Sequence, residues 1–282
     1  MKQRPFWVLK GKTAVLALIA MAVVVSFLPE KAADRWGLFE PRSLGTLFVA
    51  FGAIQVIGSF LVQRFGRRRG RILSGAMGGL VSSTAYVTRA ARQSRLHPEQ
   101  SLSRAAGAVA ANLGMILEAG VLLFIVDSRL GARMLPVLVA MGLGSLTWLY
   151  ILRRVPSQEP EGRDVEIELS LRTQLILTLL IGGLILLTGV GKVWLGSSGA
   201  MLLTAVSSLF EVHGTLVANG ELFRAGALSL ERTHLLLMLG LMMANVSKVV
   251  LAGFLGSRAF LGWMAAVMAT VSGLALLVYS LG

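Results

Sequence analysis

The chain contains no cysteine and little charge for its length. Without cysteine it forms no disulfide and has neither a thiolate metal ligand nor a cysteine nucleophile. Charged residues make up 15% of its 282 residues, whereas a soluble domain has about 25%. Only three histidines are present, which argues against a strong histidine metal site. The low charge content excludes an ordinary soluble domain.

Hydrophobic residues make up 55% of the chain, and the mean hydropathy is +0.74. A membrane-spanning helix needs about 20 apolar residues, and most of the apolar segments reach that length. The pattern predicts an all-α integral membrane protein with about seven to nine transmembrane segments. We expect it to be a multi-pass protein of the bacterial inner membrane, with the lipid bilayer as its partner. The apolar segments are residues 13–29, 43–64, 71–88, 104–126, 133–152, 172–192, 199–219, 233–255 and 259–281.

The 27 Lys and Arg residues outnumber the 14 acidic ones, giving a net charge of +13. Because they cluster beside the apolar segments, they indicate the positive-inside pattern and not a nucleic-acid partner. The N-terminus has a basic start and an apolar run, as a signal peptide does. Pro29, Glu30 and Lys31 follow the run where a cleavage site needs small residues, so we expect an uncleaved first helix with a cytoplasmic N-terminus.

Two halves of the chain repeat the same landmarks. The stretch 70–87 aligns without a gap with 199–216, at an offset of 129 residues. "AANLGMILEAG" from Ala110 and "MANVSKVVLAG" from Met243 follow in the same order. We therefore predict an internal duplication of four segments. The expected units are an N-terminal helix and loop (1–42), repeat 1 (43–152), a polar linker (153–169) and repeat 2 (170–282).

The direction of the repeats depends on the third and seventh segments. If all nine segments span, the repeats are parallel, and the basic loops 64–71 and 88–104 lie on opposite sides. If segments three and seven are broken or re-entrant, both basic loops share one side and the repeats are inverted. The positive-inside rule favours the inverted arrangement.

The seventh segment carries Glu211 and His213 inside an apolar stretch. On a continuous helix, Glu211 belongs to one polar stripe, and His213 points elsewhere unless the backbone unwinds near Gly214. A charge at mid-bilayer costs about 2.5–3.5 kcal/mol, so such residues usually face a cavity or a partner. The alternative is solvation at a membrane boundary. The stripe comprises Thr204, Ser208, Glu211, Thr215 and Asn219, and the matching face of repeat 1 comprises Gly75, Gly79, Ser82 and Tyr86.

Other polar residues also lie inside apolar segments. Ser82, Ser83 and Thr84 serve either helix packing or solute binding. Asn112 and Asn245 sit at equivalent places and need hydrogen-bond partners. Glu118 and Lys248 form either a buried ion pair between the repeats or part of a proton or ion path. The candidate binding residues are thus Ser82, Ser83, Thr84, Asn112, Glu211, His213 and Asn245, with Glu118 and Lys248 for charge coupling.

These motifs resemble the C-terminal multi-pass membrane domain, of unknown function, of bacterial MgtC/SapB-type proteins. The resemblance covers most of residues 20–270, and "GGLVSSTA" from Gly78 is its most specific part. The MgtC-type half is missing here. The resemblance implies two aspartates where this chain has Glu211 and His213, and a basic residue where it has Glu118. It implies the architecture more than a function.

The favoured function is a transporter or channel for an ion or small polar solute, with Glu211 binding a cation or exchanging a proton with His213. A hydrated cation such as Mg²⁺ needs few protein ligands, so Mg²⁺ is among the candidate solutes. The sequence assigns no metal site. One alternative cargo is an anion or lipid phosphate, drawn in by Arg64, Arg67–Arg69 and Lys248. A non-transporting membrane partner is the other alternative.

No cofactor and no enzyme activity are predicted. A hydrolase built on Ser82, His213 and Glu211 lacks a nucleophile elbow, and no phosphate-binding glycine loop opens a strand-to-helix unit. Frequent Gly and Ala on several helices suggest a homodimer.

Overall fold

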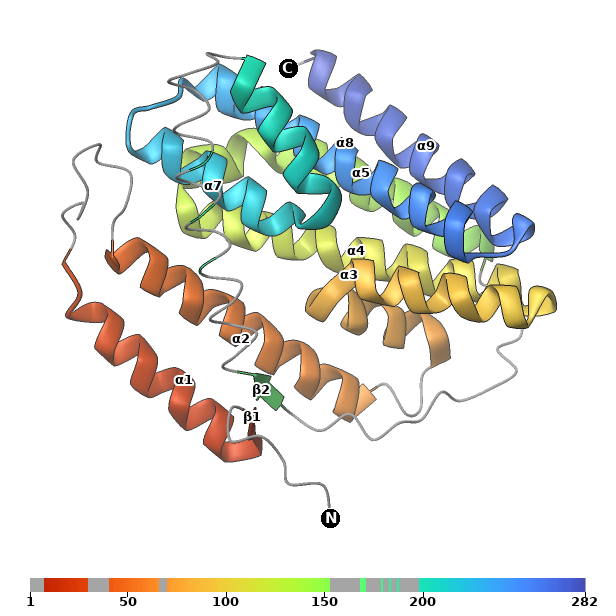
Figure 1. The fold of residues 1–282 in the computed structure, drawn as a ribbon, viewed down its shortest axis with the longest axis horizontal. Helices are drawn as coiled ribbons and strands as arrows, with labels where there is room; N and C mark the ends of the chain where they lie inside the picture. Colours follow the sequence, from red (N-terminus) through yellow and green to blue (C-terminus); the bar gives the residue numbers. More distant parts are fainter. Residues whose placement is uncertain are drawn as a thin grey trace.

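The computed structural model describes residues 8–29, 41–65, 70–152, 168–170 and 198–281, together with positions 179, 183 and 187. Helices build almost all of this part of the chain (Figure 1). We call the helical segment before α7 the pre-α7 helix. The helices are α1 (Gly11–Ser26), α2 (Pro41–Phe65), α3 (Gly70–Leu96), the 3₁₀ turn η1 (Pro98–Gln100), α4 (Ser101–Val126), α5 (Ser128–Leu152), the pre-α7 helix (Ser198–Phe210), α7 (Val212–Arg224), α8 (Leu230–Leu255) and α9 (Arg258–Leu281).

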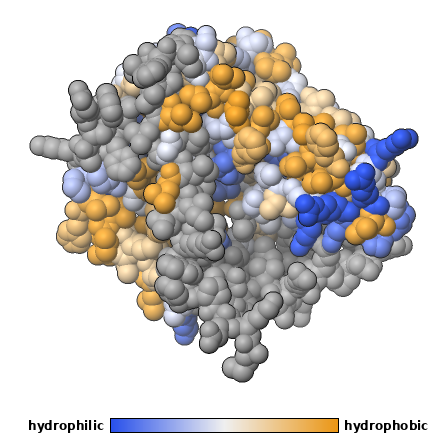
Figure 2. All heavy atoms as spheres, viewed as in Figure 1, coloured by the Kyte–Doolittle hydropathy of each residue, from blue (hydrophilic) through white to orange (hydrophobic). Residues whose placement is uncertain are grey.

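Five stretches within the described residues are long and apolar enough to cross a membrane: one within α2, one that joins η1 to α4, and α5, α8 and α9. This confirms the predicted all-α integral membrane protein. The sixth predicted segment, 172–192, lies outside the described residues apart from positions 179, 183 and 187. Orange, apolar residues cover much of the surface in Figure 2, whereas blue residues gather at the right, where α3 ends in Figure 1. Arg89, Arg92 and Arg95 are exposed there.

The third predicted segment is broken, as expected. Ser82 has an extended backbone inside α3 (φ −170°, ψ 102°). A Cβ atom placed on Gly78 would lie 2.9 Å from the ring of Tyr86. Eight residues of straight helix would separate these positions by about 12 Å, so the two arms of α3 fold back on each other. The expected loop 88–104 is wrong in part, because helix continues to Leu96 and resumes at Ser101.

The seventh predicted segment is broken in the same way. Glu211 is extended (φ −145°, ψ 101°) between the pre-α7 helix and α7. The Asn219 side-chain amide donates to Thr204 Oγ1 at 3.1 Å. On a continuous helix these residues would lie about 22 Å apart. The continuous polar stripe expected from Thr204 to Asn219 is therefore wrong: the segment is a hairpin whose arms are joined by this buried contact.

Each hairpin packs against helices of the other repeat. The second arm of α3 reaches the end of α8, where Ser94 Oγ accepts from the backbone N–H of Ser257 at 3.1 Å. At the opposite end, α7 packs on α4, and a Cβ on Gly220 would meet Val126 at 2.7 Å. Ser101, at the start of α4, contacts Ser257 after the end of α8. Helices α4 and α8 thus run in opposite directions, which is the inverted arrangement of the repeats.

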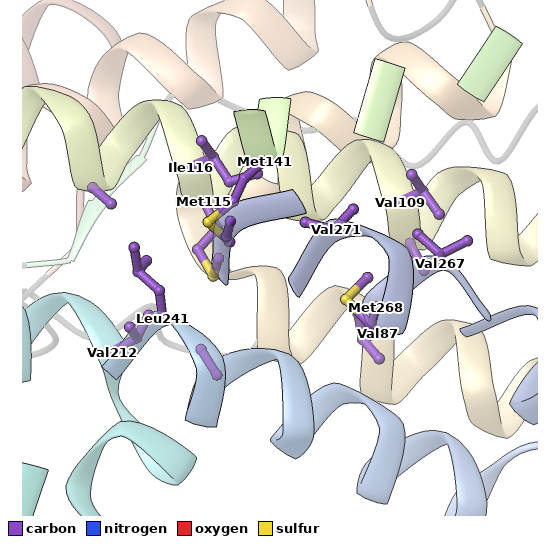
Figure 3. Close-up of a cluster of buried hydrophobic side chains, with 14 of the residues drawn as sticks. Val87, Val109, Met115, Ile116, Met141, Val212, Leu241, Val267, Met268 and Val271 are labelled. Atoms are coloured by element: carbon purple, nitrogen blue, oxygen red, sulfur yellow. The ribbon is translucent and has the colours of Figure 1, made fainter. Parts of the chain in front are cut away.

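The core lies where α3, α4, α5, α8 and α9 meet. Figure 3 shows Val87, Met115, Met141, Val267 and Val271 directed into it from four of these helices. Gly75 and Gly79 of α3 lie so close to α4 that added Cβ atoms would overlap the backbone of Gly107 and Ala111. For these two glycines the contacts favour packing, which holds the first arm of the α3 hairpin against α4.

One short antiparallel pair joins β1 (Val8–Lys10) to β2 (Glu168–Ser170), with Val8 opposite Ser170. This pairing brings the N-terminal region next to the end of the predicted linker. Most of that linker, residues 153–167, lies outside the described residues.

Candidate functional site

The break at Glu211 is held by its own carboxylate. Glu211 Oε1 accepts hydrogen bonds from the backbone N–H groups of His213 (2.9 Å) and Gly214 (3.1 Å). These N–H groups belong to the first turn of α7, which has no intrahelical acceptors for them. A negative charge is also favoured at a helix N-terminus by the helix dipole. The sequence therefore places an acidic N-cap inside an apolar segment, and this stabilises the turn of the hairpin.

His213 lies between two carboxylates. Its Nδ1 is 3.6 Å from Glu211 Oε1, and its Nε2 is 3.4 Å from Glu118 Oε2 of α4. Nε2 also lies 3.4 Å from the backbone oxygen of Met115. Acceptor oxygens thus face both ring nitrogens. The break at Glu211, three residues earlier than the expected unwinding at Gly214, is what brings these side chains together.

The carboxylate–histidine cluster, Glu118, Glu211 and His213, is largely shielded from solvent. The side chains of Glu118 and His213 are 7% and 10% exposed, whereas that of Glu211 is 29% exposed. Buried charges are costly unless they are paired. Glu118 and Glu211 also interact electrostatically with each other, and the His213 imidazole lies between them.

Of the two alternatives for Glu118 and Lys248, the structure does not show the direct ion pair. Glu118 pairs with His213, and Lys248 Nζ instead donates to Met115 Sδ at 3.0 Å and to the Ala244 carbonyl at 3.3 Å. Lys248 is 1% exposed. The ammonium group interacts electrostatically with Glu211. Met115 therefore contacts the site twice, through its carbonyl to His213 and through its sulfur to Lys248.

Ser82, Ser83 and Thr84 lie at the break of the first hairpin, inside α3. Ser82 Oγ accepts from the backbone N–H of Ala85 at 3.2 Å, which is an N-cap contact for the second arm. Ser82 is exposed, Ser83 is buried and Thr84 is half-buried. Within the described part of the chain, no hydrogen bond or ion pair joins these three residues to the carboxylate–histidine cluster. The candidate residues thus fall into two places, one at each break.

Asn112 and Asn245 are buried in α4 and α8. The Asn245 amide donates to Ser272 Oγ of α9 at 3.0 Å, while its carbonyl oxygen has no partner. Neither polar atom of the Asn112 side chain has a partner, although the residue is fully buried. Buried polar groups of this kind usually bind water or another polar group. Each asparagine lies one helical turn before a residue next to the cluster, Met115 or Lys248, and in the described part of the chain no hydrogen bond joins either asparagine side chain to the cluster.

Sequence reasoning missed two features of the site. It did not assign Met115, although Met115 and Lys248 stand at equivalent places, three residues after Asn112 and Asn245. It also missed that Glu118 faces His213, because this contact depends on the hairpin fold. Among the described residues, no group of three or more His, Asp and Glu side chains is arranged to hold a metal ion.

Comparison with known proteins places the chain in a family. Residues 49–256, more than half of the chain, match the family described as Domain of unknown function (DUF4010). The chain therefore belongs to this family, as a multi-pass membrane protein. No curated protein and no solved structure matches it.

Proposed function

We propose that the protein is a transporter or channel for an ion or small polar solute, with proton exchange at the carboxylate–histidine cluster. The observation that carries this proposal is the pair of broken hairpins, one in each inverted repeat, with the cluster at the second break. Inverted repeats with discontinuous helices place substrate and ion sites at their breaks in many transporters. Ionisable residues inside a membrane mark ion and proton pathways.

The arrangement of His213 supports the proton step. An imidazole with acceptors at both nitrogens accepts a proton on one side and releases it on the other. Glu211 is the more exposed carboxylate and exchanges with the solute route, while Glu118 receives the proton inside the protein. In this account a cation and a proton compete for the Glu211 carboxylate, and this competition couples cation transport to proton transport.

An anion is the second candidate cargo, and Lys248 favours it. Within the described residues, the Lys248 ammonium is buried against a sulfur and a carbonyl without a carboxylate in direct contact. It lies next to the cluster and would attract a negative solute. Of the other predicted anion-binding residues, Arg67–Arg69 lie outside the described residues. The finer resemblance to MgtC/SapB-type proteins and the inner-membrane location also remain expectations.

The test is a flux assay on the purified protein in liposomes, with a panel of cations, anions and a pH-sensitive dye. Glu211→Gln keeps an oxygen for the N-cap but cannot exchange a proton. Glu231→Gln, at an exposed position in the first turn of α8, is the matched control. We expect flux of one solute in the wild type and the control, and its loss in Glu211→Gln. Flux unchanged in Glu211→Gln contradicts the proposed role of the cluster, and absence of flux for every solute contradicts transport.

A further inference from the structure

A polar cavity lies at the membrane end where α2 begins and α7 ends. Its volume is about 490 Å³, and its lining includes Arg42, Ser43, Thr46, Glu221 and Arg224. Among the described lining residues, two are arginines and one is a glutamate. Arg224 donates to Ser43 Oγ at 3.2 Å and pairs with Glu221 at 3.3 Å, so its guanidinium is held at the cavity.

The first turn of α2 adds to the positive character of this cavity. Arg42 and Ser43 belong to that turn. The N-terminal turn of a helix carries the positive end of the helix dipole. Pro41 has no N–H, and the Arg42 N–H donates to the Pro29 carbonyl at 3.3 Å, so the contribution of this turn comes from the dipole and the side chains. Arginine and hydroxyl groups beside a helix N-terminus are the usual ligands of phosphate groups.

An apolar groove of about 690 Å³ begins beside this cavity and runs between α4 and α5. Ile125 lines both the cavity and the groove. From Ile125 the groove continues along Val121 and Leu117 to Leu113. Gly120 and Gly142 also line the groove. A Cβ atom added to either glycine would make only van der Waals contact with a neighbouring side chain, so there is open space beside both. Exposed Leu and Val side chains form its walls.

The length of the groove fits one lipid leaflet. Leu113 to Ile125 spans about 18 Å of helix at 1.5 Å per residue. The hydrocarbon core of a bilayer is about 30 Å thick, so one leaflet measures about 15 Å. The polar cavity lies at the end of α4 and the groove descends from it toward the middle of the membrane.

From this continuity we infer that the cavity and the groove together bind one anionic phospholipid. Its phosphate lies between Arg42 and Arg224, with the hydroxyl of Ser43 beside it, and one acyl chain lies along α4 and α5. The Thr46 hydroxyl donates to the Arg42 carbonyl at 2.8 Å and only lines the cavity. A soluble phosphate would use only the polar cavity, and a lipid without an anionic headgroup would place no negative charge beside the two arginines. This inference does not depend on the proposed transport function, since the lipid site is separate from the carboxylate–histidine cluster.

Native mass spectrometry of the full chain in detergent tests this site, with added phosphatidylglycerol and phosphatidylcholine as probes. We expect the wild type to retain phosphatidylglycerol preferentially. The double variant Arg42→Gln/Arg224→Gln removes two cationic contacts of about 1 kcal/mol each, so we expect about thirtyfold weaker retention. Arg232→Gln, near the start of α8 on the same face and outside the lipid site, is the control.

A second variant tests the binding of the acyl chain in the groove separately from the binding of the phosphate. Gly142 is half-buried, and an added Cβ would meet only Leu113, at 3.8 Å. Gly142→Leu therefore fills the groove and leaves the arginines in place, so retention of phosphatidylglycerol falls even if the double arginine variant does not fold. Equal retention of the two lipids by the wild type, or unchanged retention in Gly142→Leu, would overturn the inference. Displacement of the lipid by glycerol phosphate at equal concentration would also overturn it, since a soluble anion would then be the ligand.

Discussion

Ser82 and Glu211 occupy the same structural position in the two repeats, because each interrupts a helix with a single extended residue. Their backbone angles are φ −170°, ψ 102° and φ −145°, ψ 101°. Their separation, 211 minus 82, is the offset of 129 residues at which the two motifs align. Both side chains cap the arm that follows. One repeat uses a hydroxyl for this cap and the other uses a carboxylate, so only the second break carries a charge.

The inverted arrangement makes a clear prediction for labelling from either side of the membrane. The chain has no cysteine, so single-cysteine variants have no background. Leu96→Cys and Arg258→Cys, both at exposed positions, react with a membrane-impermeant maleimide from the same side. Arg129→Cys lies at the start of α5, next to the end of α4 that is far from Leu96, and reacts from the other side. Labelling of positions 96 and 258 from opposite sides would mean parallel repeats.

The contact between Thr204 and Asn219 holds the arms of the second hairpin together. Asn219→Leu leaves Thr204 without this buried donor and acceptor. We expect it to lower the free energy of unfolding by about 1–3 kcal/mol. Denaturant unfolding in detergent measures this change, and a double-mutant cycle with Thr204→Val isolates the pair. Additive effects of the two substitutions would show that the contact contributes nothing to the hairpin.

Close packing of α3 on α4 predicts that Gly→Ala substitutions destabilise the protein in α3 but not in α9. Gly75→Ala and Gly79→Ala introduce a Cβ that overlaps backbone atoms of α4, and we expect a loss of about 1–3 kcal/mol in unfolding free energy. Gly262→Ala and Gly273→Ala in α9 have open space around the new Cβ and serve as controls. In these two, the higher helix propensity of Ala gives no loss of stability. Equal effects at all four positions would argue against the close contact.

Asp127, between α4 and α5, gives the stability a pH dependence at low pH. Hydrogen bonds from Arg129 hold the pKa of the Asp127 carboxyl below its usual value of 3.8. A lowered folded-state pKa means that this stabilisation is present above about pH 4 and is lost as the pH falls through the folded-state pKa. Thermal unfolding between about pH 3 and 6 measures it, with Asp127→Asn as comparison. An identical pH dependence in Asp127→Asn would show that another group is responsible.

Much of the architecture follows from the sequence because it depends on local patterns. The apolar lengths predict the spanning helices, and the two basic loops on one side predict that the third segment turns back. The partner of Glu118 does not follow, since His213 reaches it only after the chain breaks at Glu211 and α7 packs on α4. Lys248 has an opposite charge available in the sequence, yet its ammonium group packs against Met115.

The lipid site is a second feature beyond the reach of sequence patterns. Arg42 and Arg224 lie 182 residues apart and come together only through the packing of α2 on the second repeat. From the sequence, Glu221 and Arg224 would be interpreted as an ordinary i,i+3 ion pair on the surface of a helix. Tertiary structure decides that this pair faces a cavity.

The central claim is that the carboxylate–histidine cluster carries protons in step with a solute, and proton flux in liposomes tests it most directly. Glu118→Gln keeps the size of the side chain and removes proton exchange at the inner carboxylate. The exposed Glu99→Gln in η1 is the control. The account predicts that solute-driven acidification falls at least about tenfold in Glu118→Gln, or about 1.4 kcal/mol, and is unchanged in Glu99→Gln. Wild-type proton flux in Glu118→Gln would contradict the claim.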